Sequence, residues 1–200
     1  TILDAGVNRY LAERGCAPAH PLVALCPVSL HDPKVKEATT NVSAVFPPLG
    51  AVDARIDVRL QQVSANMRTA KDELRNLGKA AAYAYAVLAF AISETLVIAH
   101  PERLGLPLFG SNVLVSNVRG PQETLYLNGA KLEAFFPVST LIVGIGLNVT
   151  FMSYDGQVIL GFTANGSALP EVESLARHTQ EAFAALEKAT AKRRGRARRR

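Results

Sequence analysis

Residues 141–164 have the sequence LIVGIGLNVTFMSYDGQVILGFTA, in which two apolar runs flank Asp155-Gly156. An Asp-Gly pair between apolar runs indicates a β-hairpin, because the tight turn needs positive φ angles that these two residues tolerate. The pattern predicts strands over 141–153 and 157–164. It also places Gly144-Ile145-Gly146 inside a strand with no helix after it, so a dinucleotide-binding loop is excluded and a bulge or a close ligand contact is expected.

The other elements follow outward from this hairpin. Asn128-Gly129 predicts a second, shorter hairpin made of strands at 125–127 and 131–136. Apolar runs and their periodicity predict further strands at 22–29, 41–46 and 109–118, and helices at 2–14, 53–77 and 170–191. Helices and strands alternate in the first half and two hairpins close the second, which is typical of an α/β fold with a mixed β-sheet and packed helices.

Two of the apolar segments allow more than one interpretation. In the helix at 53–77 an apolar stripe is expected to pack in the core, with a coiled-coil partner as the alternative, and Arg55 and Arg59 are expected on its polar faces. Residues 79–100 are the most hydrophobic segment of the chain. The uninterrupted run at 80–92 is shorter than the roughly 20 residues that span a bilayer, so we expect a buried helix first and membrane-surface contact second.

Basic charge is concentrated at one end of the chain. Seven of the 22 basic residues lie at 192–200, which leaves 15 basic residues against 17 acidic ones in residues 1–191. The body of the protein is therefore near −2, although the formal net charge is +5. We expect one domain over 1–191 and a disordered tail over 192–200, because like charges at this density oppose helix growth past Ala191. A specific nucleic-acid site is not expected, since such domains spread basic charge over a folded face.

Motifs for several catalytic classes are absent from the sequence. It contains no GxSxG, no phosphate-binding P-loop and no HExxH. Cys16 and Cys26 form no CxxC pair, and we expect two reduced, half-buried thiols. The four histidines have no ligand partners at metal spacing and are expected in loops or on the surface: His20, His31, His100 and His178. The sequence therefore predicts no metal and no cofactor.

Small polar side chains interrupt the apolar runs of the second half. They are Ser111-Asn112, Ser116-Asn117, Asn148 and Ser153-Tyr154. Amides and hydroxyls on strands near turns can donate hydrogen bonds to a substrate carbonyl group. The alternative is that they close turns and satisfy backbone groups.

The same stretches carry a family resemblance. Residues 116–121 (SNVRGP), 124–130 (TLYLNGA), 137–139 (PVS) and 146–156 (GLNVTFMSYDG) resemble, in this order, the C-terminal domain of bacterial wax ester synthase/diacylglycerol acyltransferases. Residues 27–30 (PVSL) and 41–43 (NVS) match two further family positions upstream. The resemblance covers nearly the whole chain up to the basic tail. Arg119 and Thr124 depart from it, because the family often has Pro at these positions.

The resemblance implies the C-terminal half of a chloramphenicol acetyltransferase-like two-domain fold, whose halves meet at a tunnel. In that family the second His of an HHxxxDG motif in the N-terminal half takes a proton from the acceptor alcohol, which then attacks an acyl-CoA thioester. This sequence has no HHxxxDG. We therefore expect no catalytic residue in this chain and an N-terminal half of the same acyltransferase as its partner. The start at Thr1 also suggests a chain cut from something longer.

The expected function is half of an acyl-CoA-dependent O-acyltransferase, a diacylglycerol acyltransferase or wax ester synthase, that is inactive alone. Acyl-CoA is the expected co-substrate, with a lipid alcohol or diacylglycerol as acceptor. The expected location is cytoplasmic, at the surface of a membrane or lipid droplet, with the basic tail against anionic lipid. The alternatives are a non-catalytic lipid or acyl-CoA binding module, and a binder of nucleic acid or anionic surfaces through the tail.

Six residues are expected to bind substrate. We expect Asn117 and Asn148 to face the tunnel and the reacting centre, because an unpaired amide in an apolar strand would be costly and something must bond to it. Ser116, Ser153 and Gly146 are expected on the same surface. Arg119 is expected near a CoA phosphate, since a guanidinium group suits phosphate geometry, with a solvated turn residue as the alternative.

Overall fold

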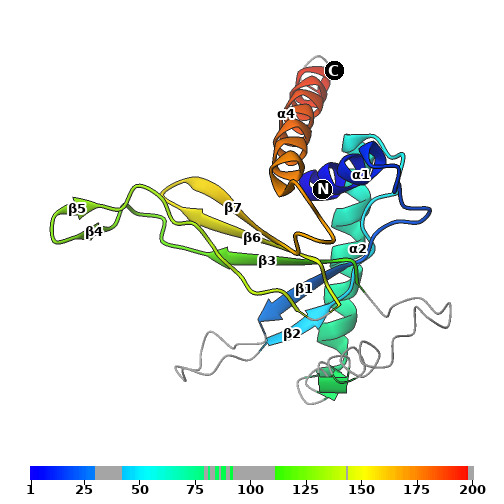
Figure 1. Cartoon of the computed structure of the whole chain (residues 1–200), viewed down its shortest axis with the longest axis horizontal. Coiled ribbons are helices and arrows are strands. Elements are labelled where there is room, and N and C mark those ends of the chain that lie inside the picture. The colour runs from blue at the N-terminus through cyan, green and yellow to red at the C-terminus, as the bar shows by residue number, and fades with distance from the viewer. Residues whose placement is uncertain are drawn as a thin grey trace.

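A computed structural model of the chain describes residues 1–29, 42–78, 111–142 and 144–197, with a few separate residues between 81 and 91. The elements in chain order are α1 (Ile2–Glu13), β1 (Ala24–Ser29), β2 (Val42–Val45), α2 (Ile56–Asn76), β3 (Val113–Arg119), β4 (Tyr126–Leu127), β5 (Ala130–Lys131), β6 (Leu147–Tyr154), β7 (Gln157–Ala164) and α4 (Val172–Ala197). Strands β3, β6 and β7 run along the longest axis of the molecule, and α4 stands out from the sheet (Figure 1).

Five strands form one mixed sheet in the order β2-β1-β3-β6-β7. β3 pairs in parallel with β1 and β6, and the two outer pairs are antiparallel. β4 and β5 form the separate hairpin expected around Asn128-Gly129. Both predicted turns have the positive φ angles that tight hairpins require, 49° at Asn128 and 46° at Asp155. The predicted mixed sheet with packed helices is therefore confirmed.

Two predicted strands are shorter in the structure. β6 begins at Leu147 rather than at 141, so Gly144-Ile145-Gly146 lies before the strand and not inside it. Gly144 has a φ of 83°, and the Ile145 N–H donates to the Ile142 carbonyl at 3.0 Å, which forms a turn. β5 ends at Lys131 rather than at 136. The strand that leaves the hairpin becomes irregular because it returns over the face of the main sheet, as described below.

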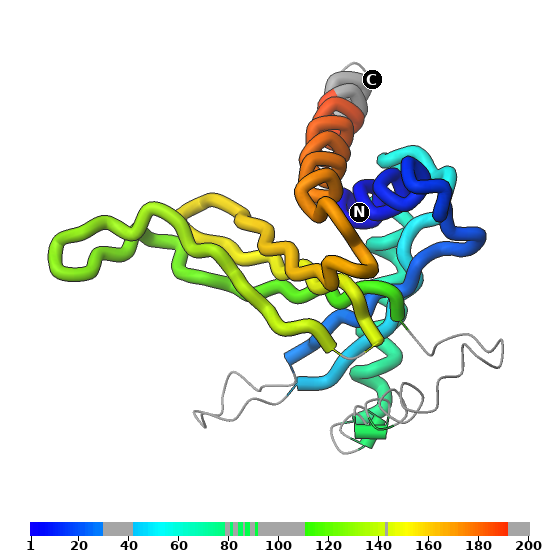
Figure 2. The backbone as a smooth tube through the Cα atoms, in the orientation of Figure 1, coloured from blue at the N-terminus to red at the C-terminus, as the bar shows by residue number. Residues whose placement is uncertain are grey.

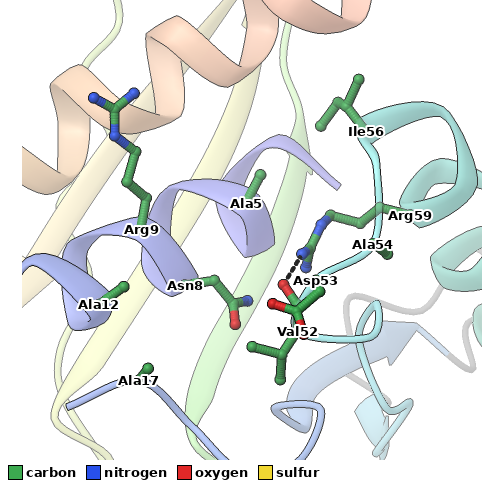
Figure 3. Close-up of a pocket in the computed structure, with 10 residues that line it drawn as sticks. All are labelled: Ala5, Asn8, Arg9, Ala12, Ala17, Val52, Asp53, Ala54, Ile56 and Arg59. Carbon is green, nitrogen blue, oxygen red and sulfur yellow. Dashed lines mark hydrogen bonds between the residues drawn. The ribbon is translucent and has the colours of Figure 1, made fainter. Parts of the chain in front are cut away.

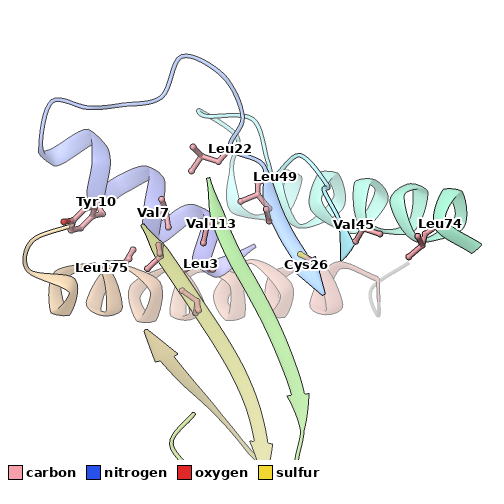
Figure 4. Close-up of a cluster of buried hydrophobic side chains, with 13 residues drawn as sticks. Leu3, Val7, Tyr10, Leu22, Cys26, Val45, Leu49, Leu74, Val113 and Leu175 are labelled. Carbon is pink, nitrogen blue, oxygen red and sulfur yellow. The ribbon is translucent and has the colours of Figure 1, made fainter. Parts of the chain in front are cut away.

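The core lies on one face of the sheet, beneath three helices. Figure 4 shows Leu3 and Val7 of α1 and Leu175 of α4 gathered over Val113 of β3, with Leu74 of α2 near Val45 at the other side. Gly6 lets α1 approach α4 closely, because a Cβ atom added there would lie 2.5 Å from the Thr179 hydroxyl and 2.9 Å from its backbone nitrogen. α1 ends at Glu13, one residue before the predicted end at 14, and Gly15 follows with a φ of 70°.

A buried ion pair joins α2 to α1. Arg59 is only 3% exposed and Asp4 of α1 is 1% exposed. The Arg59 Nη1 atom lies 2.7 Å from Asp4 Oδ2, and that carboxylate also accepts from the Gly50 N–H at 2.9 Å and from the Asn8 amide at 2.9 Å. Arg59 lies off the apolar stripe of α2, as predicted, but it is buried because α1 supplies a carboxylate at this point of the interface.

The last helix is longer than predicted. α4 continues to Ala197, past the expected end at Ala191, so residues 192–197 are helical where a disordered tail was expected. Ala, Lys and Arg are good helix formers, and basic residues near a helix C-terminus are stabilised by the helix dipole. These effects outweigh the repulsion between like charges in this stretch. Residues 198–200 lie outside the described part of the chain.

The apolar segment at 79–100 lies mostly outside the described residues, as do His31 and His100. Tyr85, Val87 and Leu88, which the structure does describe there, are exposed rather than buried. Within the described residues, no helix combines the length and the apolar character needed to cross a membrane.

Candidate functional site

The chain between β3 and β6 covers the face of the sheet opposite to the helices. It runs out into the β4–β5 hairpin and then returns along the sheet (Figure 2). Tyr154 at the end of β6 is 2% exposed; its hydroxyl donates to the Leu132 carbonyl at 2.7 Å and accepts from the Leu125 N–H at 3.0 Å. Further along, Gly161 of β7 leaves the space that the Pro137 carbonyl occupies. The segment 132–142 is thus fixed along this second face.

Asn148 is part of the contacts that hold this returning segment. It is 4% exposed, and its amide donates to the Thr140 carbonyl at 2.7 Å. Its carbonyl oxygen lies 3.4 Å from the Thr150 hydroxyl, which is 2.7 Å from the Ser139 hydroxyl. The polar groups of Asn148 therefore find partners within the chain.

A part of the helix-side face remains uncovered, because α1 and α4 lie over only one end of the sheet (Figure 1). Side chains alternate along a strand, so Asn117 and Arg119 of β3 follow Val113 and Val115 onto this face. By register, Asn117 lies beside Phe151, which in turn lies beside Leu160 of β7, and Arg119 lies beside Ser153, which in turn lies beside Val158. We call these six residues the open sheet face: Asn117, Arg119, Phe151, Ser153, Val158 and Leu160.

The open sheet face combines exposed polar and apolar side chains. Asn117, Arg119 and Val158 are exposed, and Phe151 and Leu160 are half-buried. Within the described chain, the Asn117 side chain has no hydrogen-bond partner and Arg119 has no ion-pair partner. This arrangement presents an amide and a cation beside an apolar strip, which suits a ligand with a polar group and a hydrocarbon chain.

The structure does not bring Asn117 and Asn148 together. Asn117 is level with Phe151, three positions from Asn148, so the two amides point to opposite faces of the sheet. Ser116 is level with Thr150 and shares the covered face with Asn148. Of the predicted substrate-binding residues, only Asn117, Arg119 and Ser153 share the open sheet face.

Ser153 and Gly146 both contact their own chain. The Ser153 hydroxyl accepts from the Gly120 N–H and from the Gln122 amide, each at 3.3 Å, and so holds the turn after β3. Beside Gly146, an added Cβ atom would lie 3.2 Å from Leu169 and 3.5 Å from Ala168. The space that was expected for a ligand next to Gly146 is filled by residues 168–169.

Sequence reasoning placed His178 on the surface or in a loop, but the structure buries it. His178 on α4 is 3% exposed rather than on the surface, and its Nε2 atom lies 2.8 Å from Glu13 Oε2. Burial works to raise the pKa of Glu13, but hydrogen bonds from Arg9 and His178 outweigh it and hold that pKa below its usual value.

The two cysteines are free thiols, as predicted, but they are not both half-buried: Cys16 is exposed and Cys26 is buried. Burial raises the pKa of Cys26 to about 11, so it stays protonated at neutral pH.

A cavity of about 300 Å³ lies between α1 and the segment before α2 (Figure 3). Ala5, Asn8 and Ala12 line one side of it, and Val52 and Arg59 line the other. The dashed contact in Figure 3 is the hydrogen bond from Arg59 Nη2 to the Val52 carbonyl, 2.8 Å long. None of the predicted substrate-binding residues lines this cavity. Across the described ranges, no group of His, Cys, Asp and Glu is placed to hold a metal ion.

Comparison with known proteins gives matches along nearly the whole chain. A protein with the name "Probable diacyglycerol O-acyltransferase Tgs4" from Mycobacterium tuberculosis is 36% identical over 191 residues, which is 94% of this chain and 39% of that protein. O-acyltransferase WSD from Acinetobacter baylyi is 26% identical over 193 residues, 96% of this chain and 41% of that protein.

The fold is also similar to a solved structure. The wax ester synthase/diacylglycerol acyltransferase from Marinobacter aquaeolei VT8 superposes with a TM-score of 0.78 and 27% identity, over 95% of this chain and 42% of that one. The chain thus spans about two fifths of the length of the relatives it matches. The model of the WS/DGAT C-terminal domain matches residues 39–187. This chain therefore belongs to the C-terminal domain family of the wax ester synthase/diacylglycerol acyltransferases.

Proposed function

We propose that this chain is the C-terminal half of an acyl-CoA-dependent O-acyltransferase that makes triacylglycerol or wax esters. The single observation that carries the proposal is the match to the C-terminal domain of these enzymes over residues 39–187. The matched relatives are more than twice as long as this chain. In the proposed enzyme, the part that precedes this domain supplies the general base and the opposite wall of the acyl tunnel.

The open sheet face is the proposed wall of that tunnel on this half. The reaction transfers an acyl group from a thioester to an alcohol: the alcohol oxygen attacks the carbonyl carbon as the base takes its proton, and the C–S bond then breaks to release CoA as its thiol. Negative charge develops on the carbonyl oxygen in between. We assign the Asn117 amide to that oxygen, Phe151 and Leu160 to the acyl chain, and Arg119 to a CoA phosphate.

We assign Asn148 to a different role. Its hydrogen bonds to Thr140 and Thr150 support a positioning residue that holds the segment 137–142 on the second face. Ser116 lies on that face as well. In this proposal, Ser153 shapes the turn that carries Arg119, through its contacts with Gly120 and Gln122.

Two alanine substitutions in the full-length enzyme test these assignments. Asn117→Ala should lower kcat/KM by about 10²–10³ with an unchanged melting temperature, because it removes a donor to the developing oxyanion. Asn148→Ala should destabilise the fold by about 1 kcal/mol, because it removes a partly buried hydrogen bond from a side chain that is only 4% exposed. Asn76→Ala, an exposed amide at the end of α2, is the matched control and should change neither quantity. Normal kcat/KM in Asn117→Ala would remove Asn117 from the site.

The second candidate is a module that binds acyl-CoA or lipid without catalysis. The observation in its favour is that no residue on the open sheet face can serve as a general base. Equilibrium binding of a non-hydrolysable acyl-CoA thioether separates the two functions. A full-length protein that binds this ligand but transfers no acyl group to hexadecanol or diacylglycerol would support the module and contradict the enzyme.

A further inference from the structure

The C-terminal end of α4 lies apart from the open sheet face and from the segment 132–142 that covers the second face. α4 is 26 residues long, and it stands out from the body of the fold (Figure 1). Its first turns pack in the core through Leu175 and Thr179. Beyond them Phe183 is 48% exposed, and Leu186, one turn further on, is half-buried. The helix thus carries apolar side chains past the end of the core.

Basic charge is concentrated at the end of this helix and in the residues that follow it in sequence. Residues 192–200 hold seven basic residues and no acidic one, whereas residues 1–191 are near −2. Lys188 and Lys192, and Lys192 and Arg196, are four residues apart in sequence, a spacing at which like charges on a helix repel each other. A polyanionic surface would offset this repulsion. Binding to such a surface would therefore favour the helical form of this stretch.

We propose that the end of α4, from Phe183 to Ala197, docks on a lipid bilayer that contains anionic phospholipids. Basic residues near an anionic leaflet are attracted to it, and an exposed aromatic ring on the same helix is stabilised at the boundary between headgroups and acyl chains. Duplex nucleic acid satisfies the charges but offers no apolar layer for Phe183. The choice of a lipid partner rests on the proposed function, since the lipid acceptors and products of that reaction reside in such layers.

Vesicle flotation of the full-length protein tests the docking without any measurement of activity. The variant K192Q/R193Q/R194Q removes three charges and keeps good helix formers. The control R68Q/K71Q/R75Q removes the same charge from the exposed face of α2. With phosphatidylcholine vesicles that contain phosphatidylglycerol, the first variant should bind on the order of 100-fold more weakly than the wild type, because each basic residue adds to the attraction. The control should stay within a few-fold of the wild type.

Three outcomes would overturn the proposal. Unchanged vesicle binding by K192Q/R193Q/R194Q would show that the end of α4 is not the docking surface, and an equal loss in the control would show that only net charge matters. If this variant loses salt-sensitive binding to duplex DNA at physiological salt while vesicle binding is unaffected, the partner is nucleic acid. Turnover on detergent-dispersed substrates is measured separately. A protein that docks on vesicles but transfers no acyl group contradicts the proposed function and leaves the docking intact.

Discussion

At the scale of single residues, the Asp4–Arg59 pair is an ion pair inside the fold. Both side chains are almost completely buried, so each charge depends on the other and on nearby polar groups. The Asp4 carboxylate has three partners, from Arg59, Gly50 and Asn8, and Arg59 also donates to the Val52 carbonyl. The pair therefore joins α1, α2 and the segment between β2 and α2 at one point.

Removing only one charge of this pair should destabilise the folded state. Arg59→Met should lower the free energy of unfolding by about 3–5 kcal/mol, because it leaves the Asp4 charge buried without a counterion. Adding Asp4→Asn should recover a large part of that loss, since the amide is neutral and still accepts from the Gly50 N–H. Urea denaturation of the single and double variants measures both effects. Arg75→Met, which breaks an exposed pair with Asp72, is the control and should cost at most about 1 kcal/mol.

Equal stability of the Arg59→Met single and double variants would contradict this view of the pair.

The burial of Arg59 could be predicted from the sequence only in part. Periodicity places Arg59 off the apolar stripe of its helix, and this much is correct. Its burial follows from a carboxylate on a different helix, which periodicity within one helix does not contain. For the same reason the buried position of His178 could not be predicted, because its partner Glu13 belongs to α1.

At the scale of elements, the features set by local chemistry were predictable and those set by distant contacts were not. The turns at Asn128-Gly129 and Asp155-Gly156 follow from the backbone angles that these residues adopt. The course of 132–142 over the second face depends on contacts with β6 and β7, so the expected strand at 131–136 was too long. The same contacts place Asn148 beneath that segment. Only the register of β3 with β6 reveals that Asn117 points the other way.

Tyr154 holds the base of the β4–β5 hairpin through hydrogen bonds to Leu125 and Leu132. Tyr154→Phe should keep the ring contact with Phe135 and remove the hydrogen bonds to Leu125 and Leu132. Amide hydrogen exchange in residues 125–132 should then become faster by about 10-fold, as expected for a loss of roughly 1–2 kcal/mol of local stability. Exchange in α1 and α4 should not change. Unaltered exchange at 125–132 would mean that the hairpin is held by other contacts.

At the scale of the whole molecule, the sequence resemblance and the fold agree on the family. The resemblance rests on ordered motifs, and these coincide with β3, the hairpin turn, and β6 with its turn. What the motifs leave open is which of their polar residues support the fold and which face a ligand. The structure separates them by face: Asn148 and Ser116 lie on the covered side, and Asn117 and Arg119 lie on the open sheet face.

The most direct measurement of the central claim is CoA release from palmitoyl-CoA, with hexadecanol or diacylglycerol as acceptor. Three samples are compared: this chain alone, this chain with the part of the enzyme that precedes it added as a second polypeptide, and the full-length enzyme. Turnover is expected in the full-length enzyme, at a lower level in the two-part mixture, and not in this chain alone, because the proposed general base belongs to the proposed N-terminal half. Robust turnover by the 200 residues alone, or none in the full-length enzyme, would contradict the claim.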